Sequence, residues 1–544
     1  MKNTSSLFRV LFFLLALSFS LSAQKIQVGP YALRVNGTQQ EKNHWGPSEV
    51  TYRVANDSLV FQVSEFLWDE KTKTAQAKGG EIPGEKLGHK NARIQLDAIQ
   101  FEPANGTLRI ISADWIEGDQ TKNGEGSLTL RRKDKYFSFE FRGSEPTTFS
   151  GEAWTAEGAP YYKDLRKGLR NGVLRFGNLG AMSAPLIAFL PDSTILVPTG
   201  RWTSLLSEKD SLSRTELTGQ WYPKSQTFHF KKLPGASNRA LFEDTFHEMR
   251  MSVDLGVLRV REKRIDFYQI SGRNQVPAWL ESKDYYNGGR IQDLQGMLTY
   301  SPMRILYRYL VENKAQNATI DDLAVLVNRK PEQIQSGFQS FVEAGYMQVE
   351  GDVYSFTNQG KHYARVAYEK KDFDTFYAAS MGDRLDADSA SISLDLVDKK
   401  LRIRGVQQVM ISDSLKAEFI PYDEALTFQK GRDFNFPGEI KIGDYRFRGP
   451  DFAFKFNDFT AQFSKIDSIT FIPKGQSKEF GGQFRYESGS LILSEPGNKS
   501  GRFGVAEYPK LIIPKGMTAH FDEDTMHRLS ERTLVGRIGA ASEI

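Results

Sequence analysis

Hydrophobic and polar residues alternate over short stretches through much of the chain. Between residues 24 and 290, the runs Val50–Val54, Ser58–Val63, Tyr136–Phe141 and Thr227–Phe230 alternate or stay apolar. Successive side chains of a strand point to opposite faces of its sheet, so this period indicates strands with one buried face. The pattern predicts an N-terminal β-rich region over 24–295.

Turn signals and a loose repeat separate these runs. Asn-Gly pairs at 36–37 and 105–106 predict turns, because both residue types tolerate positive φ. An Asp-Ser pair, an apolar strand and a proline recur at 192–198, 413–421 and 467–473, and Ile-Pro-Lys-Gly occurs at 472–475 and 513–516. Asp-Ser can close a turn, and proline can end a strand. The repeat predicts stacked β-layers, as a solenoid or serial sandwiches; chance recurrence is the alternative.

The hydrophobic period lengthens between residues 296 and 370 and becomes helical. Met303, Leu306 and Leu310 share one helix face. Thr319, with an aspartate three residues on, has a capping-box pattern, and Pro331 suits the first turn of a third helix. That helix has its apolar face at Ile334, Phe338, Phe341 and Val342, and Gly345 is placed to end it.

A hairpin and a last helix complete this segment. Strands are expected at 347–350 and 353–356, turning at Gly351-Asp352, with a helix at 358–369. Three helices and a hairpin in this order resemble a winged-helix domain over residues 296–370. The resemblance rests on pattern rather than on a specific motif.

The β pattern returns after residue 374, at 391–394, 401–404 and 452–456. Phe452, Phe454 and Phe456 are expected to line a core; as exposed aromatics they could instead bind glycans or peptides. The fold class predicted is mainly β with an α+β insert, with a C-terminal β-repeat region over 371–524. Residues 525–544 carry no aromatic side chain. We expect an irregular tail there, in a chain cut or altered in mid-repeat so that strand 518–521 lacks its partner; a loose terminus is the alternative.

The N-terminus has the pattern of a secretory signal peptide over residues 1–23. Lys2 and Arg9 precede an apolar run over 10–21 that ends in Ser22-Ala23. The run is shorter than the roughly 20 residues of a membrane span, and no later stretch approaches that length. The sequence therefore predicts export to the periplasm or to the cell surface and outer membrane, with no transmembrane span after signal removal.

Composition excludes several chemistries. The chain has no Cys, which rules out thiol catalysis, disulfide frameworks and thiolate metal sites. The net charge of +4 falls to about +2 when Lys2 and Arg9 leave with the signal peptide. Such a balance gives no argument for nucleic acid or an anionic membrane as partner.

Candidate metal and catalytic motifs are incomplete. His247-Glu248 begins like a zincin helix, but Met251 stands where the second histidine is needed. His520 and His527, with acidic residues 522–524 between them, could share a helix face, and Asp383–Asp388 has the alternation of a calcium loop without its glycine and closing glutamate. We expect a turn at 383–388 and no metal or cofactor. Neither a G-x-S-x-G elbow nor a phosphate loop is present, so catalytic residues stay unknown.

The segment 297–370 carries eight basic and eight acidic residues. DNA affinity depends on neutralising phosphates, and an exported protein does not meet the chromosome. We therefore expect a packing or protein-docking module and no nucleic acid partner.

Four C-terminal segments carry a wider resemblance: Glu439–Gly449, Asp467–Ile469, Asn498–Arg502 and Glu507–Pro509. They look like parts of large, uncharacterised exported proteins of Bacteroidetes-type bacteria, across residues 290–520. The resemblance implies a multidomain envelope protein, longer than this chain, and transfers no catalytic residue. The function expected is structural or binding, with envelope proteins or glycans as partners. The alternative is a secreted hydrolase of polysaccharide or peptide, and a third reading is envelope assembly through exposed strand edges.

Overall fold

The computed structural model describes residues 21–28, 31–54, 57–102, 104–133, 136–233, 241–270, 277–381, 389–472, 480–504, 507–514, 518–521, 525–528 and 534–537. It is mainly β, with 56% strand, 13% helix, a large antiparallel sheet and a small helical region around residues 288–368, which confirms the predicted mainly-β class. Apart from residues 21–23, the predicted signal peptide lies outside the described residues.

The chain divides into two compact units. Unit 1 comprises residues 1–175 and 183–198, and unit 2 comprises residues 176–182 and 199–544. Two strands, β15 (Ala181–Phe189) and β16 (Ile195–Leu205), have residues in both units.

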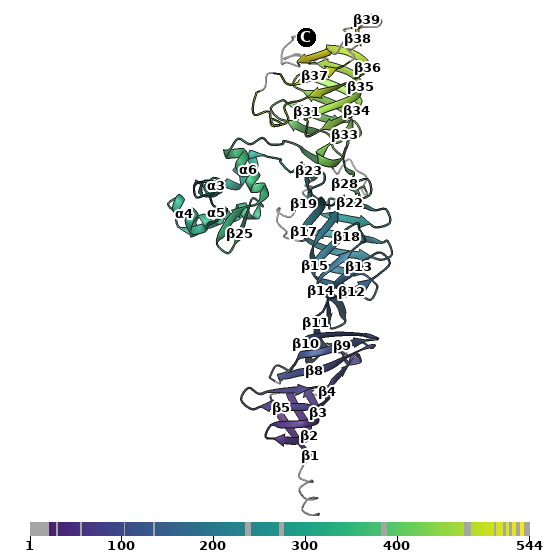
Figure 1. The fold of residues 1–544 in the computed structure, drawn as a ribbon, viewed down its shortest axis with the longest axis vertical. Coiled ribbons are helices and arrows are strands. Elements are labelled where there is room, and N and C mark those ends of the chain that lie inside the picture. Colours follow the sequence, from purple (N-terminus) through teal and green to yellow (C-terminus); the bar gives the residue numbers. More distant parts are fainter. Residues whose placement is uncertain are drawn as a thin grey trace, which may run out of the picture. The chain divides into compact units, whose positions relative to one another are not determined.

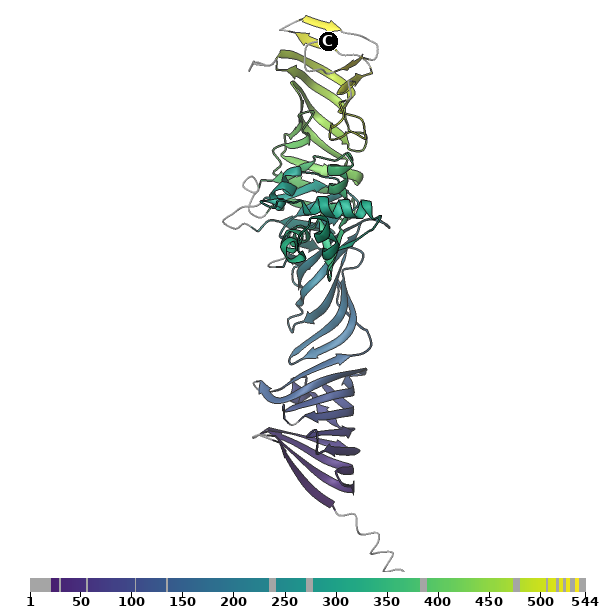
Figure 2. The same cartoon turned by 90° about the vertical axis from the view of Figure 1, so that its left-hand side faces the viewer.

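Unit 1 is a series of antiparallel strands, drawn from purple to blue in Figures 1 and 2. They are β1 (Leu21–Val28), β2 (Tyr31–Glu41), β3 (His44–Val54), β4 (Asp57–Val63), β5 (Glu65–Asp69), β6 (Thr74–Lys78), β7 (Glu81–Pro83), β8 (Ala92–Glu102), β9 (Thr107–Glu117), β10 (Gln120–Lys133), β11 (Tyr136–Gly143), β12 (Thr147–Ser150), β13 (Thr155–Lys163) and β14 (Arg166–Arg175). A 3-10 turn, η1 (Gly84–Leu87), precedes β8.

Long strands of unit 1 repeatedly pair with interrupted ones. β3 pairs with β4 and β5, β8 with β6 and β7, and β13 with β11 and β12. Each interruption lets the chain bend while its partner strand continues, and Figure 2 shows the strands of this unit curving.

Large aromatic side chains fill the interior of unit 1. Trp45, Tyr52 and Trp115 are fully buried. The Trp115 indole stacks on the Tyr162 ring with centroids 4.0 Å apart, and His89 meets Trp115 edge-on at 5.2 Å. The alternation of buried and partly exposed positions that predicted the strand at 136–141 is present along β11.

One of the two predicted Asn-Gly turns is correct. Gly106 adopts φ 66° in the turn between β8 and β9, as expected. The turn predicted at Asn36-Gly37 is wrong, because both residues lie inside β2. Gly37 instead allows a close approach between strands: a Cβ there would lie 2.0 Å from Ser48 Oγ on β3.

Two strand ladders form the centre of unit 2. One comprises β18 (Thr227–Lys232), β21 (Leu255–Arg259), β22 (Arg264–Tyr268), β28 (Ile392–Asp395), β29 (Leu401–Arg404) and β32 (Ala425–Phe428). The other comprises β19 (Phe242–Asp244), β20 (Met249–Ser252), β23 (Ala278–Ser282), β27 (Tyr377–Ser380), β30 (Val409–Ser412) and β31 (Ala417–Pro421). We call them ladder A and ladder B.

Both ladders begin and end on shared strands. β17 (Ser211–Tyr222) pairs with β18 of ladder A and β19 of ladder B, and β33 (Phe434–Ile442) pairs with β32 and β31. Aromatic rings pack between the ladders: Phe242 of ladder B lies 5.9 Å from Phe230 and 5.2 Å from Phe267 of ladder A. A hydrophobic layer therefore separates the two ladders.

The helical region is inserted between β23 and β27, two neighbouring strands of ladder B. We call residues 283–376 the insert; Figure 1 shows its helices gathered together. Its elements are α2 (Gly288–Gln295), α3 (Pro302–Glu312), β24 (Ala318–Thr319), α4 (Ile320–Leu326), α5 (Pro331–Glu343), β25 (Met347–Glu350), β26 (Val353–Phe356) and α6 (Asn358–Tyr368).

The predicted ends of these helices are confirmed. Thr319 caps α4, and its side chain and that of Asp322 each bond the other's backbone N–H. Pro331 occupies the first turn of α5, and Gly345 follows that helix with φ 84°. The hairpin occupies the predicted residues, whereas the helix α2 and the short strand β24 are additional.

Past the ladders, β33 continues into β34 (Tyr445–Lys455), β35 (Thr460–Phe471) and β36 (Phe480–Ile492). Four short strands follow: β37 (Lys510–Ile513), β38 (Thr518–Phe521), β39 (Thr525–Arg528) and β40 (Leu534–Arg537). The prediction that strand 518–521 lacks a partner is wrong, since β38 pairs with β36 and β39. Phe452, Phe454 and Phe456 are buried, which confirms their core role.

The Asp-Ser repeat is only partly structural. Asp413-Ser414 lies in the turn before β31, and Pro421 ends that strand, as predicted. Asp467-Ser468 does not form a turn but lies within β35, where the register shifts at a bulge. Pro198 also lies inside a strand, β16, rather than ending it. Pro473 is outside the described residues.

Candidate functional site

The insert leaves and rejoins ladder B at one place. Ser282 N–H donates to the Phe376 carbonyl at 3.2 Å, Tyr286 N–H to the Asp374 carbonyl at 3.1 Å, and Asp374 N–H to the Asp284 carbonyl at 3.0 Å. We call these two paired segments, residues 282–287 and 371–376, the insert root. They continue the β23–β27 hairpin toward the helices.

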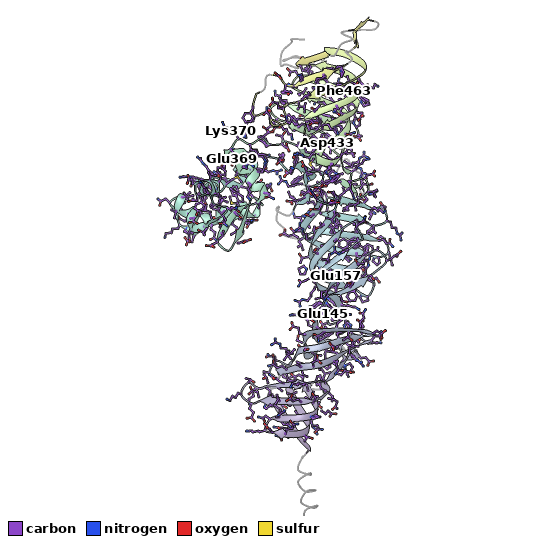
Figure 3. All side chains as sticks on the ribbon, in the orientation of Figure 1. Glu145, Glu157, Glu369, Lys370, Asp433 and Phe463 are labelled. Carbon is purple, nitrogen blue, oxygen red and sulfur yellow. The ribbon has the colours of Figure 1, made fainter. Side chains whose placement is uncertain are left out.

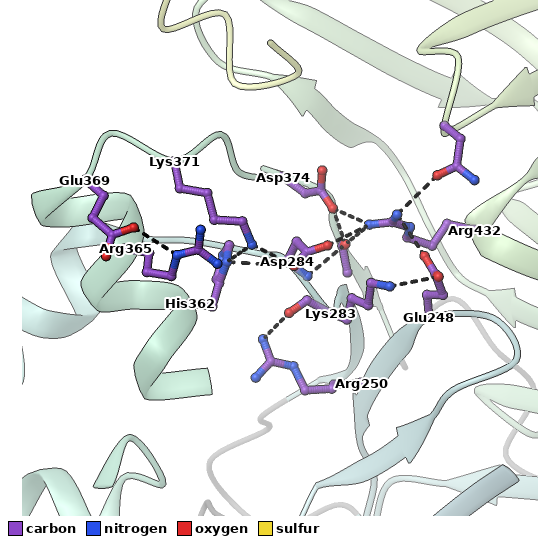
Figure 4. A network of polar contacts seen from close by, with 12 residues as sticks. Glu248, Arg250, Lys283, Asp284, His362, Arg365, Glu369, Lys371, Asp374 and Arg432 are labelled. Carbon is purple, nitrogen blue, oxygen red and sulfur yellow. Dashed lines mark hydrogen bonds and ion pairs between the residues drawn. The ribbon is translucent and has the colours of Figure 1, made fainter. Parts of the chain in front are cut away.

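Arg432 occupies the centre of the root, although it comes from the connection between β32 and β33. Its Nη1 donates to Asp374 Oδ2 at 2.5 Å and to Ser282 Oγ at 3.0 Å, and Ser282 Oγ donates to the same carboxylate oxygen. Its Nη2 lies 2.8 Å from Glu248 Oε2. The guanidinium also covers the Phe456 ring at 4.5 Å. Figure 4 shows the hydrogen bonds and ion pairs converging on the Arg432 side chain.

Arg432 adopts an unfavourable backbone conformation at this position. Its φ of 74° lies in the left-handed region, which costs a non-glycine residue roughly 1 kcal/mol. The side chain is 5% exposed, so the charge is removed from water. Burial raises the pKa of the Asp374 carboxyl, and the Arg432 guanidinium opposes that rise. The cost of burying both charges is offset only while they remain paired.

A second layer of contacts joins the root to helix α6. Asp284 Oδ1 lies 3.8 Å from Lys371 Nζ and 3.7 Å from Nδ1 of His362, a nearly buried residue of α6. Lys371 Nζ donates to His362 Nδ1 at 3.4 Å. Burial lowers the pKa of His362 to about 4, so its imidazole is neutral near pH 7 and accepts that bond.

Glu281 fastens the other side of the root to helix α2. Its carboxylate is fully buried and lies 3.1 Å from Arg250 on β20 and 2.8 Å from Arg290 on α2. Arg290 also covers the Tyr285 ring at 4.9 Å. A single carboxylate thus links a strand of ladder B to a helix of the insert.

The connection between β36 and β37 covers the outgoing segment of the root. Asp372 accepts bonds from the backbone N–H groups of Lys499 and Ser500, at 2.8 and 3.0 Å. Arg502 donates to the Val366 carbonyl on α6 at 3.0 Å and covers the Phe373 ring at 5.3 Å. Residues 248–250, Arg432 and residues 499–502, three distant parts of unit 2, therefore hold the insert.

The chemistry of the root is that of a clamp. Asp374, Glu248, Glu281 and Asp284 each have an Arg or Lys nitrogen within 4.0 Å. These charge-assisted contacts occupy the carboxylate oxygens, so the role of the four side chains is to hold segments of the chain together. Across the described residues, no group of three or more His, Asp or Glu side chains is arranged to hold a metal.

The histidine singled out by sequence has a structural role. His247 is fully buried; its Nδ1 lies 2.6 Å from Asp244 Oδ2 and its Nε2 lies 2.8 Å from the Lys399 carbonyl oxygen. Both ring nitrogens are therefore occupied. Glu248 pairs with Lys283 and Arg432, and Met251 is buried in β20. The side chains of this segment therefore hold parts of unit 2 together.

Two other sequence candidates are outside what is described. Residues 383–388 and 522–524 lie outside the described residues, and for His520 and His527 only the strand backbones of β38 and β39 are described.

Sequence reasoning missed the central residues of the root. Ser282, Asp374 and Arg432 are far apart in the chain and belong to no motif. The local feature that marks the position of Arg432 is the glycine before it, in a short Lys-Gly-Arg turn.

No protein-family model matches the chain, and no curated protein matches it. Among the helices of the described residues, none has both the length and the hydropathy to cross a membrane.

Proposed function

We propose that the protein is an exported structural or binding protein of the cell envelope, in which a sandwich-like pair of β-ladders holds a winged-helix-like module for docking another protein. The observation that carries the proposal is the root. A buried arginine from a remote connection, Arg432, fixes the two segments through which the insert leaves ladder B. Such a clamp suits a module that must be presented in a fixed orientation.

The element order of the insert supports the winged-helix interpretation. Helix α3, strand β24, helices α4 and α5, and the hairpin β25–β26 follow one another, and the three strands form a small sheet in the order β24–β26–β25. One hydrophobic cluster, which includes Leu306, Leu323 and Phe338, holds these elements together.

The surface of α5 favours a protein partner over DNA. This is the helix that would read DNA in a winged-helix domain, and it contains no Lys or Arg from Pro331 to Glu343. Its exposed side chains are polar or acidic: Glu332, Gln333, Gln335, Ser336, Gln339 and Glu343. A phosphate backbone requires cationic contacts that this face does not offer.

Cell fractionation tests the envelope assignment. The mature protein is expected in the periplasmic or outer-membrane fraction, with its N-terminus near residue 24. Recovery of the intact chain in the cytoplasm would overturn the proposal.

A deletion tests the docking role of the insert. Residues 288–368 are replaced by a short Gly-Ser linker, which retains the Arg432–Asp374 pair and the β23–β27 hairpin. In cross-linking experiments on cells, the full chain is expected to form a discrete envelope adduct that this variant loses. An adduct of equal yield in both proteins would place docking outside the insert.

A further inference from the structure

Lys122, on β10 of unit 1, is a buried lysine with an incomplete set of partners. It is 8% exposed, and its Nζ donates to Tyr162 Oη at 3.0 Å. Tyr162 Oη in turn donates to Glu117 Oε2 at 3.4 Å. The charge of Glu117 also acts on Lys122, although the direct contact of that carboxylate is with Lys167.

A second lysine shares the same surroundings. Lys167 on β14, one third exposed, donates to Glu117 Oε2 at 3.1 Å. Both ammonium groups lie over the ring of Phe149 on β12, Lys122 at 5.2 Å and Lys167 at 4.8 Å. Among the contacts of the described residues, the two ammonium groups therefore share the Glu117 carboxylate.

Burying two ammonium groups beside one carboxylate is energetically costly. Burial, with the nearby charge of Lys167, lowers the pKa of Lys122. Removing an ammonium group from water without a paired anion is unfavourable, and buried charges in proteins are ordinarily paired. An anion between Lys122 and Lys167 would supply the missing partner.

Aromatic side chains adjoin the two lysines. Phe149 meets Phe189 on β15 edge-on with centroids 5.2 Å apart, and Trp154 stacks on Phe189 at 5.6 Å. All three rings are partly exposed. Glu145 and Glu157, labelled in Figure 3, mark this region, since Glu157 lies opposite Thr148, the neighbour of Phe149 in β12.

We propose that this lysine–aromatic cluster of unit 1 binds an acidic saccharide. A carboxylate or phosphate on the sugar would pair with the two ammonium groups, entering from the exposed side at Lys167. The apolar C–H face of the sugar ring would pack on the partly exposed aromatic rings, whose faces carry negative charge density. The site is separate from the insert and goes beyond the proposed function, so either proposal can fail alone.

Titration calorimetry on the full mature chain tests the site with four probes: oligogalacturonate, a neutral galacto-oligosaccharide of the same length, poly-glutamate and inorganic phosphate. Oligogalacturonate is expected to bind, and the other three to bind at least tenfold more weakly. Equal binding of poly-glutamate or phosphate overturns saccharide recognition, and equal binding of the neutral oligomer overturns the role of the anion.

Variants locate the binding. Lys122→Met keeps the aliphatic stem and removes the charge, and it is expected to weaken oligogalacturonate binding about tenfold to a hundredfold, the range for losing a charge-assisted hydrogen bond. Phe149→Ala is expected to weaken the binding of oligogalacturonate more than the binding of inorganic phosphate. Lys163→Met removes a charge from an exposed pair with Glu140 in the same unit and is the matched control. Unchanged binding in folded Lys122→Met and Lys167→Met proteins overturns the proposal.

Discussion

The insert root and the lysine–aromatic cluster each bury a cationic side chain, but the two cations differ in how many carboxylates contact them. Arg432 meets the carboxylates of Asp374 and Glu248 at 2.5 and 2.8 Å. In the described residues, Lys122 donates to a neutral hydroxyl and lies over the Phe149 ring, and the Glu117 carboxylate near it already binds Lys167. Removing one partner of a buried ion pair leaves an unpaired buried charge, so the Arg432 contacts hold the root to the rest of unit 2. For Lys122 we propose instead a partner from outside the chain.

The largest expected effect concerns Arg432, whose charge is paired with the carboxylates of Asp374 and Glu248. Arg432→Met leaves Asp374 buried without its counter-ion, and we expect a loss of about 3–5 kcal/mol in the free energy of unfolding of unit 2, measured by urea denaturation. Arg402→Met removes one partner of an exposed pair with Asp423 and is expected to cost less than about 1 kcal/mol. Similar losses in the two variants would contradict the role given to the root.

The next effect is a pH dependence in the same region. His362 has a pKa of about 4 in the folded chain and about 6.5 when unfolded, so the unfolded state binds more protons between these values. Its contribution is present above pH 6.5 and is lost as the pH falls toward 4. Asp284 favours the protonated imidazole, while Lys371 and Arg250 disfavour it.

Hydrogen exchange of the α6 amides measures this dependence. Between pH 7.5 and pH 5 the opening free energy is expected to fall by about 2 kcal/mol in the native chain. In His362→Gln that fall should be absent, after correction for intrinsic exchange. Because burial raises the pKa of Asp374, that group has the opposite pH slope, and the difference between the two proteins isolates His362.

A smaller effect concerns the insert away from its root. Thr319→Ala removes half of the capping box of α4 and is expected to cost about 1 kcal/mol in the opening free energy of that helix. Asp321→Asn changes a neighbouring charge without touching the cap bonds and is the control. If Thr319→Ala lowered the hydrogen-exchange protection of amides throughout the root, the root contacts would depend on folding of the helices. We expect the root contacts to persist without the cap.

The smallest expected effect on stability is that of replacing Lys122. Without ligand, Lys122→Met should change the stability of unit 1 by no more than about 1 kcal/mol, because it removes a desolvated ammonium group and only one hydrogen bond to Tyr162. Thermal unfolding of the two proteins measures this. A loss as large as that of Arg432→Met would mean that Lys122 is structural.

The insert was predictable from sequence because its signals are local. Thr319, Pro331 and Gly345 each act within one helical turn of their own positions, and the hairpin needs only Gly351-Asp352 at its turn. The alternation in β11 and β34 also identified strands directly. Nothing local distinguished Asn36-Gly37 from a turn, since the reason for that glycine is Ser48 on the neighbouring strand.

The ladders and the candidate sites could not be predicted, because they depend on long-range pairing. Asp266 on β22 accepts a bond from Ser393, 127 residues later, and Arg432 reaches Ser282 across 150 residues. Likewise Lys122 lies in a polar stretch, and only the fold places it beside Phe149 and Tyr162. The local residue pattern therefore identifies a helix or strand. It does not show which distant segment pairs with that strand or supplies the counter-ion of a charged side chain.

The position of the insert within ladder B has a consequence for the order of folding. As the chain is made, β22 and β23 emerge before the insert, while their partners β28 and β27 follow it. The insert has mainly local contacts and can collapse early, which brings the ends of a long loop together before the strands must find each other. Fast folding of the insert would thereby shorten the time for which the half-built ladders present open edges.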